Sequence, residues 1–166
     1  YLASIVGLVL VLVMGTTVNG SRRWLLIAGL SIQPSEFAKL AVVVGMALIV
    51  AERTESNGGR RVRGLDVLLM LVLAGLPAML IILQPDLGTM LVLSATVLGV
   101  IAVSGAPRRY LVGLFGGGVA AAIGAVALGV LKPYQLDRFL AFIDPALDPR
   151  GAGYNTTQAR IAIGNG

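Results

Sequence analysis

The sequence predicts an all-α protein, a polytopic bundle of transmembrane helices, from three observations. Hydrophobic residues make up 57% of the chain and charged residues only 13%, whereas soluble globular domains hold about 45–50% apolar and about 25% charged residues. The mean hydropathy is +0.89. Five apolar runs are each close to the ~20 residues with which a helix crosses the hydrocarbon core of a bilayer.

The predicted spans are separated by polar connections. The first two are joined by a turn with two arginines and a tryptophan, residues 19–24, and by an apolar stretch, residues 25–33, that is too short to cross and is expected to lie along the interface. The segment 52–64 is charged and expected in water, and spans three and four form a tight helical hairpin. The spans are residues 1–18, 35–51, 65–83, 88–104 and 110–131.

Residues 132–166 differ in character, with seven charged residues and three prolines. They are expected to form a soluble loop with short amphipathic pieces. The chain begins inside an apolar run at Tyr1 and stops at Gly166 without a terminating element, so we interpret it as an internal piece of a larger membrane protein.

Arginines set the predicted orientation. The loops 52–64 and 105–109 share one side and carry six arginines, and six basic residues lie in the short first loop and the tail on the other side. The positive-inside rule weights short loops. It therefore favours 52–64 and 105–109 as cytoplasmic and places the tail outside.

The residue types that are missing narrow the chemistry. The sequence has no cysteine and no histidine, which excludes disulfides, thiolate nucleophiles, Cys/His zinc sites and a histidine base. Acid–base chemistry falls to carboxylates, lysine or tyrosine. The net charge of +5 comes from basic residues scattered between spans, a pattern that favours membrane orientation and anionic lipid over nucleic acid.

Two similar motifs are the most informative feature: Gln33-Pro34-Ser35-Glu36 and Gln84-Pro85-Asp86-Leu87-Gly88-Thr89. Proline suits the first helical position, and an acid in the first turn meets the free N–H groups and the positive end of the helix dipole. If the chain crosses the membrane and returns between the motifs, both acids lie at one membrane face. We expect Glu36 and Asp86 to approach each other across one outer cavity.

Each of these residues also has a structural interpretation. Glu36 and Lys39 are three apart on a helix and can form a salt bridge that makes their burial cheaper. Asp86 can act as a helix-start residue in a tight hairpin. Function is favoured for both acids, because ionisable residues in spans cost about 2.5–3.5 kcal/mol each on insertion scales and Asn or Ser would start a helix without charge.

Other candidates stay open on the residues alone. The arginines at 22 and 23 suit interfacial anchors or phosphate binders equally, and Trp24 favours an anchor. Tyr134, Gln135 and Arg138 can share a helical face that holds a sugar or phosphate, or can belong to a solvated loop. Gly113 and Gly117 have GxxxG spacing, which favours close packing against another helix of the chain over a dimer face.

Taken together, the motifs resemble the SEDS family of bacterial membrane proteins, which includes RodA and FtsW, and the tail is more similar to RodA. The matching stretches run in the family's order along essentially the whole chain. They are residues 19–24, 33–39, 84–89, 133–135, Arg138, 142–145, 148–149, 151–154, Gln158 and 161–164.

The resemblance implies about ten spans, of which five lie here, followed by the first part of a large extracytoplasmic loop at 132–166. It implies a peptidoglycan polymerase of the bacterial cytoplasmic membrane that transfers glycosyl units from lipid II with inversion and works with a class B penicillin-binding protein. Cations of the protein or a divalent metal, Mg²⁺ or Mn²⁺, would offset the charge of the departing diphosphate. The residues that it assigns to the cavity and its loops are Glu36, Lys39, Asp86, Arg23, Trp24, Arg138 and Gln158.

The aspartate usually assigned as the family's base would lie beyond Gly166, so the catalytic base stays unassigned and residues 1–166 alone are expected to be inactive. The main alternative is a transporter or flippase for a lipid-linked precursor, which also uses acids in interrupted helices. A non-catalytic scaffold is a third interpretation, but it leaves both Gln-Pro motifs unexplained.

Overall fold

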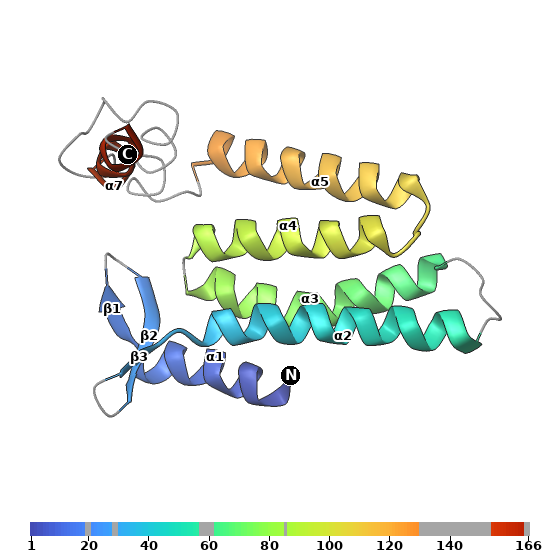
Figure 1. Cartoon of the computed structure of the whole chain (residues 1–166), viewed down its shortest axis with the longest axis horizontal. Coiled ribbons are helices and arrows are strands. Elements are labelled where there is room, and N and C mark those ends of the chain that lie inside the picture. Colours follow the sequence, from blue (N-terminus) through green and yellow to red (C-terminus); the bar gives the residue numbers. More distant parts are fainter. Residues whose placement is uncertain (19–20, 28–29, 57–61, 85, 130–153, 165–166) are drawn as a thin grey trace. The chain divides into compact units, whose positions relative to one another are not determined.

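The computed structural model describes all residues except 19–20, 28–29, 57–61, 85, 130–153 and 165–166. It divides into two units, Tyr1–Gly116 and Gly117–Gly166, and each is considered by itself. The described elements (Figure 1) are α1 Leu2–Met14, β1 Thr16–Val18, β2 Ser21–Ile27, β3 Leu30–Ile32, α2 Pro34–Ser56, α3 Gly64–Leu83, α4 Leu87–Val103, α5 Arg108–Ala127 and α7 Tyr154–Gly164.

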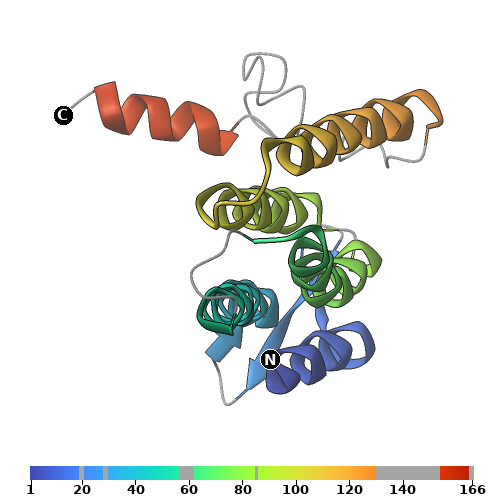
Figure 2. The same ribbon diagram turned by 90° about the vertical axis from the view of Figure 1, so that its right-hand side faces the viewer.

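The first unit is built around a bundle of α1 to α4. Helix α2 contacts α1, α3 and α4, and α3 contacts both α1 and α4; Figure 2 views these helices nearly end-on. Between helices in lipid, close van der Waals packing replaces the hydrophobic effect as the main attraction. The largest fully buried apolar side chains of this core are Leu8, Met46, Met70, Ile81, Leu93 and Ile101.

The predicted fold class, a polytopic bundle of transmembrane helices, is confirmed, and a helix lies in each predicted range. Among the described residues, α2, α3 and α5 are long and apolar enough to cross a membrane. Helices α1 and α4 have 13 and 17 residues, or about 20 and 26 Å at 1.5 Å per residue. They are therefore shorter than the spans expected at 1–18 and 88–104.

The connection between α1 and α2 corrects the expectation of a turn and an interfacial stretch. It forms an antiparallel sheet in the order β1-β2-β3, and Val18 pairs with Ser21 and Ile27 with Leu30. Asn19-Gly20 fills the two positions between the first pair, and this dipeptide is a strong hairpin signal. The β-branched run that starts at Thr16 also ends α1 early, because such residues favour strands.

Two helix boundaries differ from the expected ones. Helix α2 continues to Ser56, so the first residues of the charged segment 52–64 are helical; Glu and Arg are good helix formers. Helices α4 and α5 each end two residues before a glycine in the left-handed region, Gly105 with φ 78° and Gly129 with φ 65°. Glycine adopts this conformation without a Cβ penalty, which makes it the usual residue after a helix end.

Two side-chain hydrogen bonds join α1 to α3. Pro77, inside α3, has no N–H to donate to the carbonyl of Leu73, and the hydroxyl of Tyr1 donates to that carbonyl at 2.7 Å. The amide of Gln84 donates to the carbonyl of Leu8 at 3.1 Å. The Tyr1 hydrogen bond therefore satisfies the carbonyl of Leu73, which Pro77 leaves without its usual helical donor.

We predict that Gly45→Leu weakens the α2–α3 contact. A Cβ at Gly45 would stand 2.6 Å from a methyl carbon of Leu73, whereas a Cβ at Gly75 would have nothing within 4 Å. The Leu73 methyl can move away from a Cβ alone, but the three further carbons of a leucine would overpack the contact, at a cost of about 1–3 kcal/mol. In thermal unfolding of the purified full-length protein, Gly45→Leu should lower the Tm and the control Gly75→Leu should not. Equal Tm values for the two variants would contradict the packing described here.

Candidate functional site

The start of α4 holds a buried carboxylate. Asp86 is the N-cap of α4: its Oδ1 accepts from the backbone N–H of Thr89 at 3.2 Å, and its Oδ2 accepts from the Thr89 hydroxyl at 2.8 Å. The Asp86 side chain is only 4% exposed. An aspartate N-cap satisfies free N–H groups of the helix, so the structural interpretation of Asp86 accounts for part of its environment.

Two donors from distant parts of the chain complete that environment. Arg23, on β2, has its Nη1 3.4 Å from Asp86 Oδ1. Gln33, the residue before α2, has its Nε2 3.5 Å from both Asp86 Oδ2 and Thr89 Oγ1. Arg23, Gln33, Asp86 and Thr89 are called the Asp86 cluster below.

Further polar side chains are buried around the cluster. Gln84 and Ser35 are each 2% exposed. Within the described part of the chain, Ser35 Oγ and Arg23 Nε make no hydrogen bond. Arg23 therefore contacts Asp86 through only part of its fork of five N–H donors.

The second acid is much more open. Glu36 lies in the first turn of α2, and its Oε1 accepts from Lys39 Nζ at 2.9 Å. The Glu36 side chain is 55% exposed and that of Lys39 is 17% exposed. The other oxygen of Glu36 meets no donor among the described residues, so it can take a ligand without breaking a bond.

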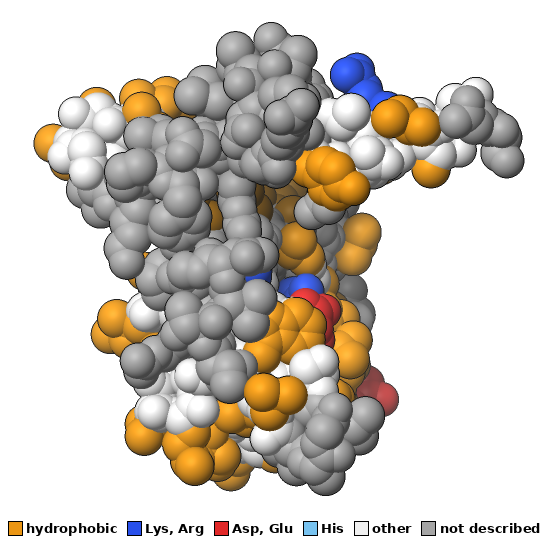
Figure 3. All heavy atoms as spheres, turned by 90° about the vertical axis from the view of Figure 1, so that its left-hand side faces the viewer, with side chains coloured by type: hydrophobic (Ala, Val, Ile, Leu, Met, Phe, Trp, Pro, Cys, Tyr) orange, Lys and Arg blue, Asp and Glu red, His pale blue; other side chains and the backbone are white. Residues whose placement is uncertain are grey.

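Both acids stand where helices begin, and this arrangement sets the charge of the region. The four ionised side chains, Arg23, Lys39, Glu36 and Asp86, sum to zero. The starts of α2 and α4 add about half a positive charge each from their free N–H groups, and Gln33 holds these starts together. Figure 3 shows this end of the bundle, with acidic and basic side chains next to each other among apolar ones. Such a region favours an anionic ligand.

The structure thus brings Arg23 to Asp86 and Lys39 to Glu36, and gives the two acids separate partners. Helix α2 begins at Pro34 as predicted, whereas α4 begins at Leu87 and Asp86 precedes its first turn. Trp24 lies half-buried on β2, paired with Thr16. Gln158 is exposed on α7 in the second unit, and the predicted site residue Arg138 lies outside the described residues, as do Tyr134 and Gln135.

Sequence reasoning missed a second buried acid. Asp66 is 3% exposed, and its Oδ2 accepts from the backbone N–H of Arg63 at 2.8 Å in a capping box at the start of α3. Its Oδ1 lies 3.4 Å from Arg53 Nε near the end of α2. The signal was an acid three residues after the N-cap. This contact links the end of α2 to the start of α3.

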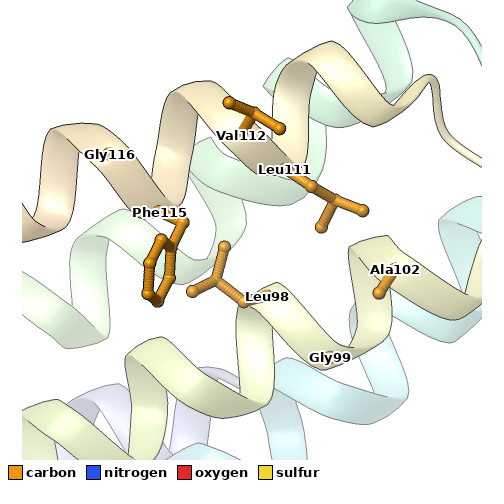
Figure 4. Close-up of a pocket in the computed structure, with 7 residues that line it drawn as sticks. All are labelled: Leu98, Gly99, Ala102, Leu111, Val112, Phe115 and Gly116. Carbon is orange, nitrogen blue, oxygen red and sulfur yellow. The ribbon is translucent and has the colours of Figure 1, made fainter.

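A groove between α4 and the first half of α5 has a different chemistry. Its volume is about 560 Å³, and in Figure 4 Leu98 of α4 and Phe115 of α5 point toward each other across it. The lining contains no polar side chain, so it offers no group for catalysis. It consists of Leu98, Gly99, Ala102, Leu111, Val112, Phe115 and Gly116.

The GxxxG pair on α5 is not packed in the described part of the chain. A Cβ at Gly113 or at Gly117 would have nothing within 4 Å, and α5 has no buried residue. The favoured interpretation, close packing against another helix of this chain, is therefore not seen among the described residues.

The fold and the site define a polytopic helical membrane protein with a polar site at one end of its bundle. A sequence model of the FtsW/RodA/SpoVE family, described as cell cycle proteins, matches residues 1–166. The chain therefore belongs to this family.

Individual relatives agree. The chain is 38% identical over 163 residues to the probable peptidoglycan glycosyltransferase FtsW of Aeromonas salmonicida, covering 98% of this chain and 40% of that relative. It is similar to a solved chain of a peptidoglycan synthase complex that coordinates polymerization and crosslinking, with 39% identity, TM-score 0.69 and coverage of 97% of this chain and 46% of that chain.

It is also similar to the crystal structure of the rod shape determining protein RodA of Thermus thermophilus, with 38% identity, TM-score 0.60 and coverage of 72% of this chain and 38% of that chain. The chain thus spans about 40% of the length of the curated relatives it matches.

We predict that Arg23→Met destabilises the full-length protein by about 1–3 kcal/mol, the cost of leaving a buried polar partner less well satisfied. The loss should stay below the ~3–5 kcal/mol of a broken, fully buried ion pair, because Asp86 keeps its other donors. Unfolding of the purified protein in detergent measures the change. The control Arg108→Met, at an exposed position, should change stability by less than about 0.5 kcal/mol. Equal effects of the two variants would contradict the Arg23–Asp86 pair.

Proposed function

We propose that the full-length protein is a peptidoglycan glycosyltransferase of the SEDS type. It transfers glycosyl units from lipid II with inversion and releases a lipid diphosphate. The observation that carries this proposal is the pair of adjoining helix starts with Arg23, Lys39 and two acids, at one end of an apolar bundle, in a chain that matches the family over residues 1–166.

The substrate's charge fits this region. In the proposed reaction, negative charge builds up on the departing diphosphate, and fixed cations and helix N-termini stabilise such charge most effectively where water is scarce. Arg23 and Lys39 are the cations of the described site, and Trp24, Arg138 and Gln158 are proposed to lie beside the same substrate. Glu36 and Asp86 line one extracytoplasmic cavity in this proposal.

The base that takes the proton from the acceptor hydroxyl is proposed to lie beyond Gly166. Asp86 suits that role poorly, because donors of the chain occupy both of its oxygens. We accordingly expect residues 1–166 alone to make no polymer.

A divalent cation fits the site only in part. Mg²⁺ is usually held by one or two carboxylates together with substrate phosphates. Among the described residues no three acids gather, and Glu36 offers one open carboxylate oxygen. Glu36 would therefore hold Mg²⁺ or Mn²⁺ together with the diphosphate, where the ion would neutralise charge on the leaving group.

The proposed partner is a class B penicillin-binding protein that crosslinks the strands, supported by the likeness to the chain of a peptidoglycan synthase complex. The proposed location is the bacterial cytoplasmic membrane, in many spans. We propose a RodA-type role in cell elongation and shape from Lys132-Pro133-Tyr134-Gln135 and from Ala146 after Asp144-Pro145, all outside the described residues. Identities of 38% to the FtsW relative and to the RodA structure do not separate the roles.

The second candidate is a flippase for the same lipid-linked precursor. It is favoured by the proline inside α3, because transporters use helices interrupted in this way, whereas acids at helix ends rather than mid-span favour the enzyme. A flippase moves lipid II without consuming it, so product analysis separates the two candidates.

We predict that the purified full-length protein, with its penicillin-binding partner and Mg²⁺ or Mn²⁺, converts lipid II to glycan strands. Glu36→Ala removes the carboxylate proposed to hold the divalent ion, and Asp86→Ala removes the acceptor that positions Arg23 and Gln33, so each should lower the rate at least about 100-fold. Glu55→Ala, at an exposed position at the far end of α2, is the control. Polymer from residues 1–166 alone, or full activity of either site variant, would overturn these assignments.

We predict that the loops 52–64 and 105–109 face the cytoplasm and that the tail after Lys132 faces outside. Because the chain has no native cysteine, single cysteines at Gly58 and Ala146 can be labelled without background. An impermeant thiol reagent applied to spheroplasts should label the cysteine at 146 and leave the one at 58 unlabelled until the cells are lysed. The reverse result would invert the orientation.

A further inference from the structure

We infer that Gln33 is a positioning residue for the proposed reaction. Its side-chain amide ties the start of α2, with Glu36 and Lys39, to Asp86 and Thr89 at the start of α4. The inference rests on the proposed function and adds a division of roles to it: Asp86 is an internal acceptor that holds the site together, and Glu36 is the acid left open to substrate.

Donors of the chain occupy both oxygens of the Asp86 carboxylate. A carboxylate has about four acceptor positions, and this chain supplies four donors, two for each oxygen: Arg23 and the Thr89 N–H for Oδ1, and the Thr89 hydroxyl and Gln33 for Oδ2. With 4% of the side chain exposed, a substrate hydroxyl reaches Asp86 only by displacing one of these donors. Glu36 has one oxygen free and is 55% exposed.

Gln33 makes contacts through both its backbone and its side chain. Its backbone carbonyl accepts from the N–H of Glu36 at 3.1 Å, while its side-chain nitrogen faces Asp86 and Thr89. One residue therefore connects the open acid to the occupied acid. A misplacement of about 1 Å costs about 100-fold in rate. A substitution at Gln33 should therefore lower the rate of catalysis by displacing Glu36 and Lys39.

The polarity of the Gln33–Asp86 contact makes it testable. Gln33→Glu sets a second carboxylate against Asp86, and Asp86→Asn replaces the acceptor Oδ2 with a second donor facing Gln33. The double variant Gln33→Glu/Asp86→Asn exchanges donor and acceptor, keeps every heavy-atom position and keeps one negative charge in the cluster. Asparagine is also as good an N-cap as aspartate, so the start of α4 is preserved.

The experiment compares four full-length proteins: the unsubstituted protein, the two single variants and the double variant. The Tm of each is measured, together with the rate at which it forms glycan polymer from lipid II per folded molecule. Each single variant should lose about 10-fold to 100-fold in rate. The double variant should recover to within about threefold of the unsubstituted protein and should have a higher Tm than either single variant. Glu52→Gln, an exposed charge change at the far end of α2, is the control and should alter neither quantity.

If the unsubstituted protein forms polymer, either of two results would overturn the inference. If the Tm recovers in the double variant and the rate does not, the carboxylate at 86 itself meets the substrate and Gln33 has only a structural role. If neither recovers, the contact between Gln33 and Asp86 does not position the site. If the unsubstituted protein forms no polymer at all, the proposed function fails and the role in catalysis fails with it, while the Tm comparison still decides whether the two residues are coupled.

Discussion

A carboxylate buried between apolar helices has to be surrounded by donors from its own chain, and the first unit is organised around this requirement at Asp86. An ion that is withdrawn from water and left unpaired costs several kcal/mol. The donors come from β2, from the residue before α2 and from the first turn of α4. The segment between α1 and α2 and the first turn of α4 each supply hydrogen-bond donors to Asp86. The path of that segment is therefore coupled to the position at which α4 begins.

A second buried carboxylate, Asp66, lies at the opposite end of the bundle, and its ion pair is weaker. Asp66 is also buried beside a helix start, but its cationic partner, Arg53, has a side chain that is 44% exposed. Exposed ion pairs contribute about 0–1 kcal/mol, so backbone capping by Asp66 is its main contribution. The two ends differ in consequence: the contacts of Asp66 join consecutive helices, α2 and α3, whereas those of Asp86 join the start of α4 to two segments that lie 63 and 53 positions earlier in the sequence.

Local signals explain what could be predicted from sequence. The apolar runs located the helices, and Pro34 located the start of α2, because both features act through neighbouring residues. The strands at 16–32 were missed although Asn19-Gly20 marked a hairpin, since the apolar residues 25–27 and 30–32 were interpreted as an interfacial segment. The contacts of Asp86 with Arg23 and of Gln33 with Asp86 and Thr89 were beyond reach. They join residues 63, 53 and 56 positions apart, and only packing of the helices sets those separations.

The short sheet also bears on how deep the Asp86 cluster lies in the membrane. An open three-stranded sheet has two unpaired edges, at β1 and β3, and free backbone N–H and C=O groups are not tolerated against lipid hydrocarbon. We therefore expect the sheet to lie near the level at which the acyl chains end, or to be shielded from lipid by other parts of the protein. Because Arg23 belongs to the middle strand of the sheet and reaches Asp86, we expect the Asp86 cluster at the same depth, within reach of water.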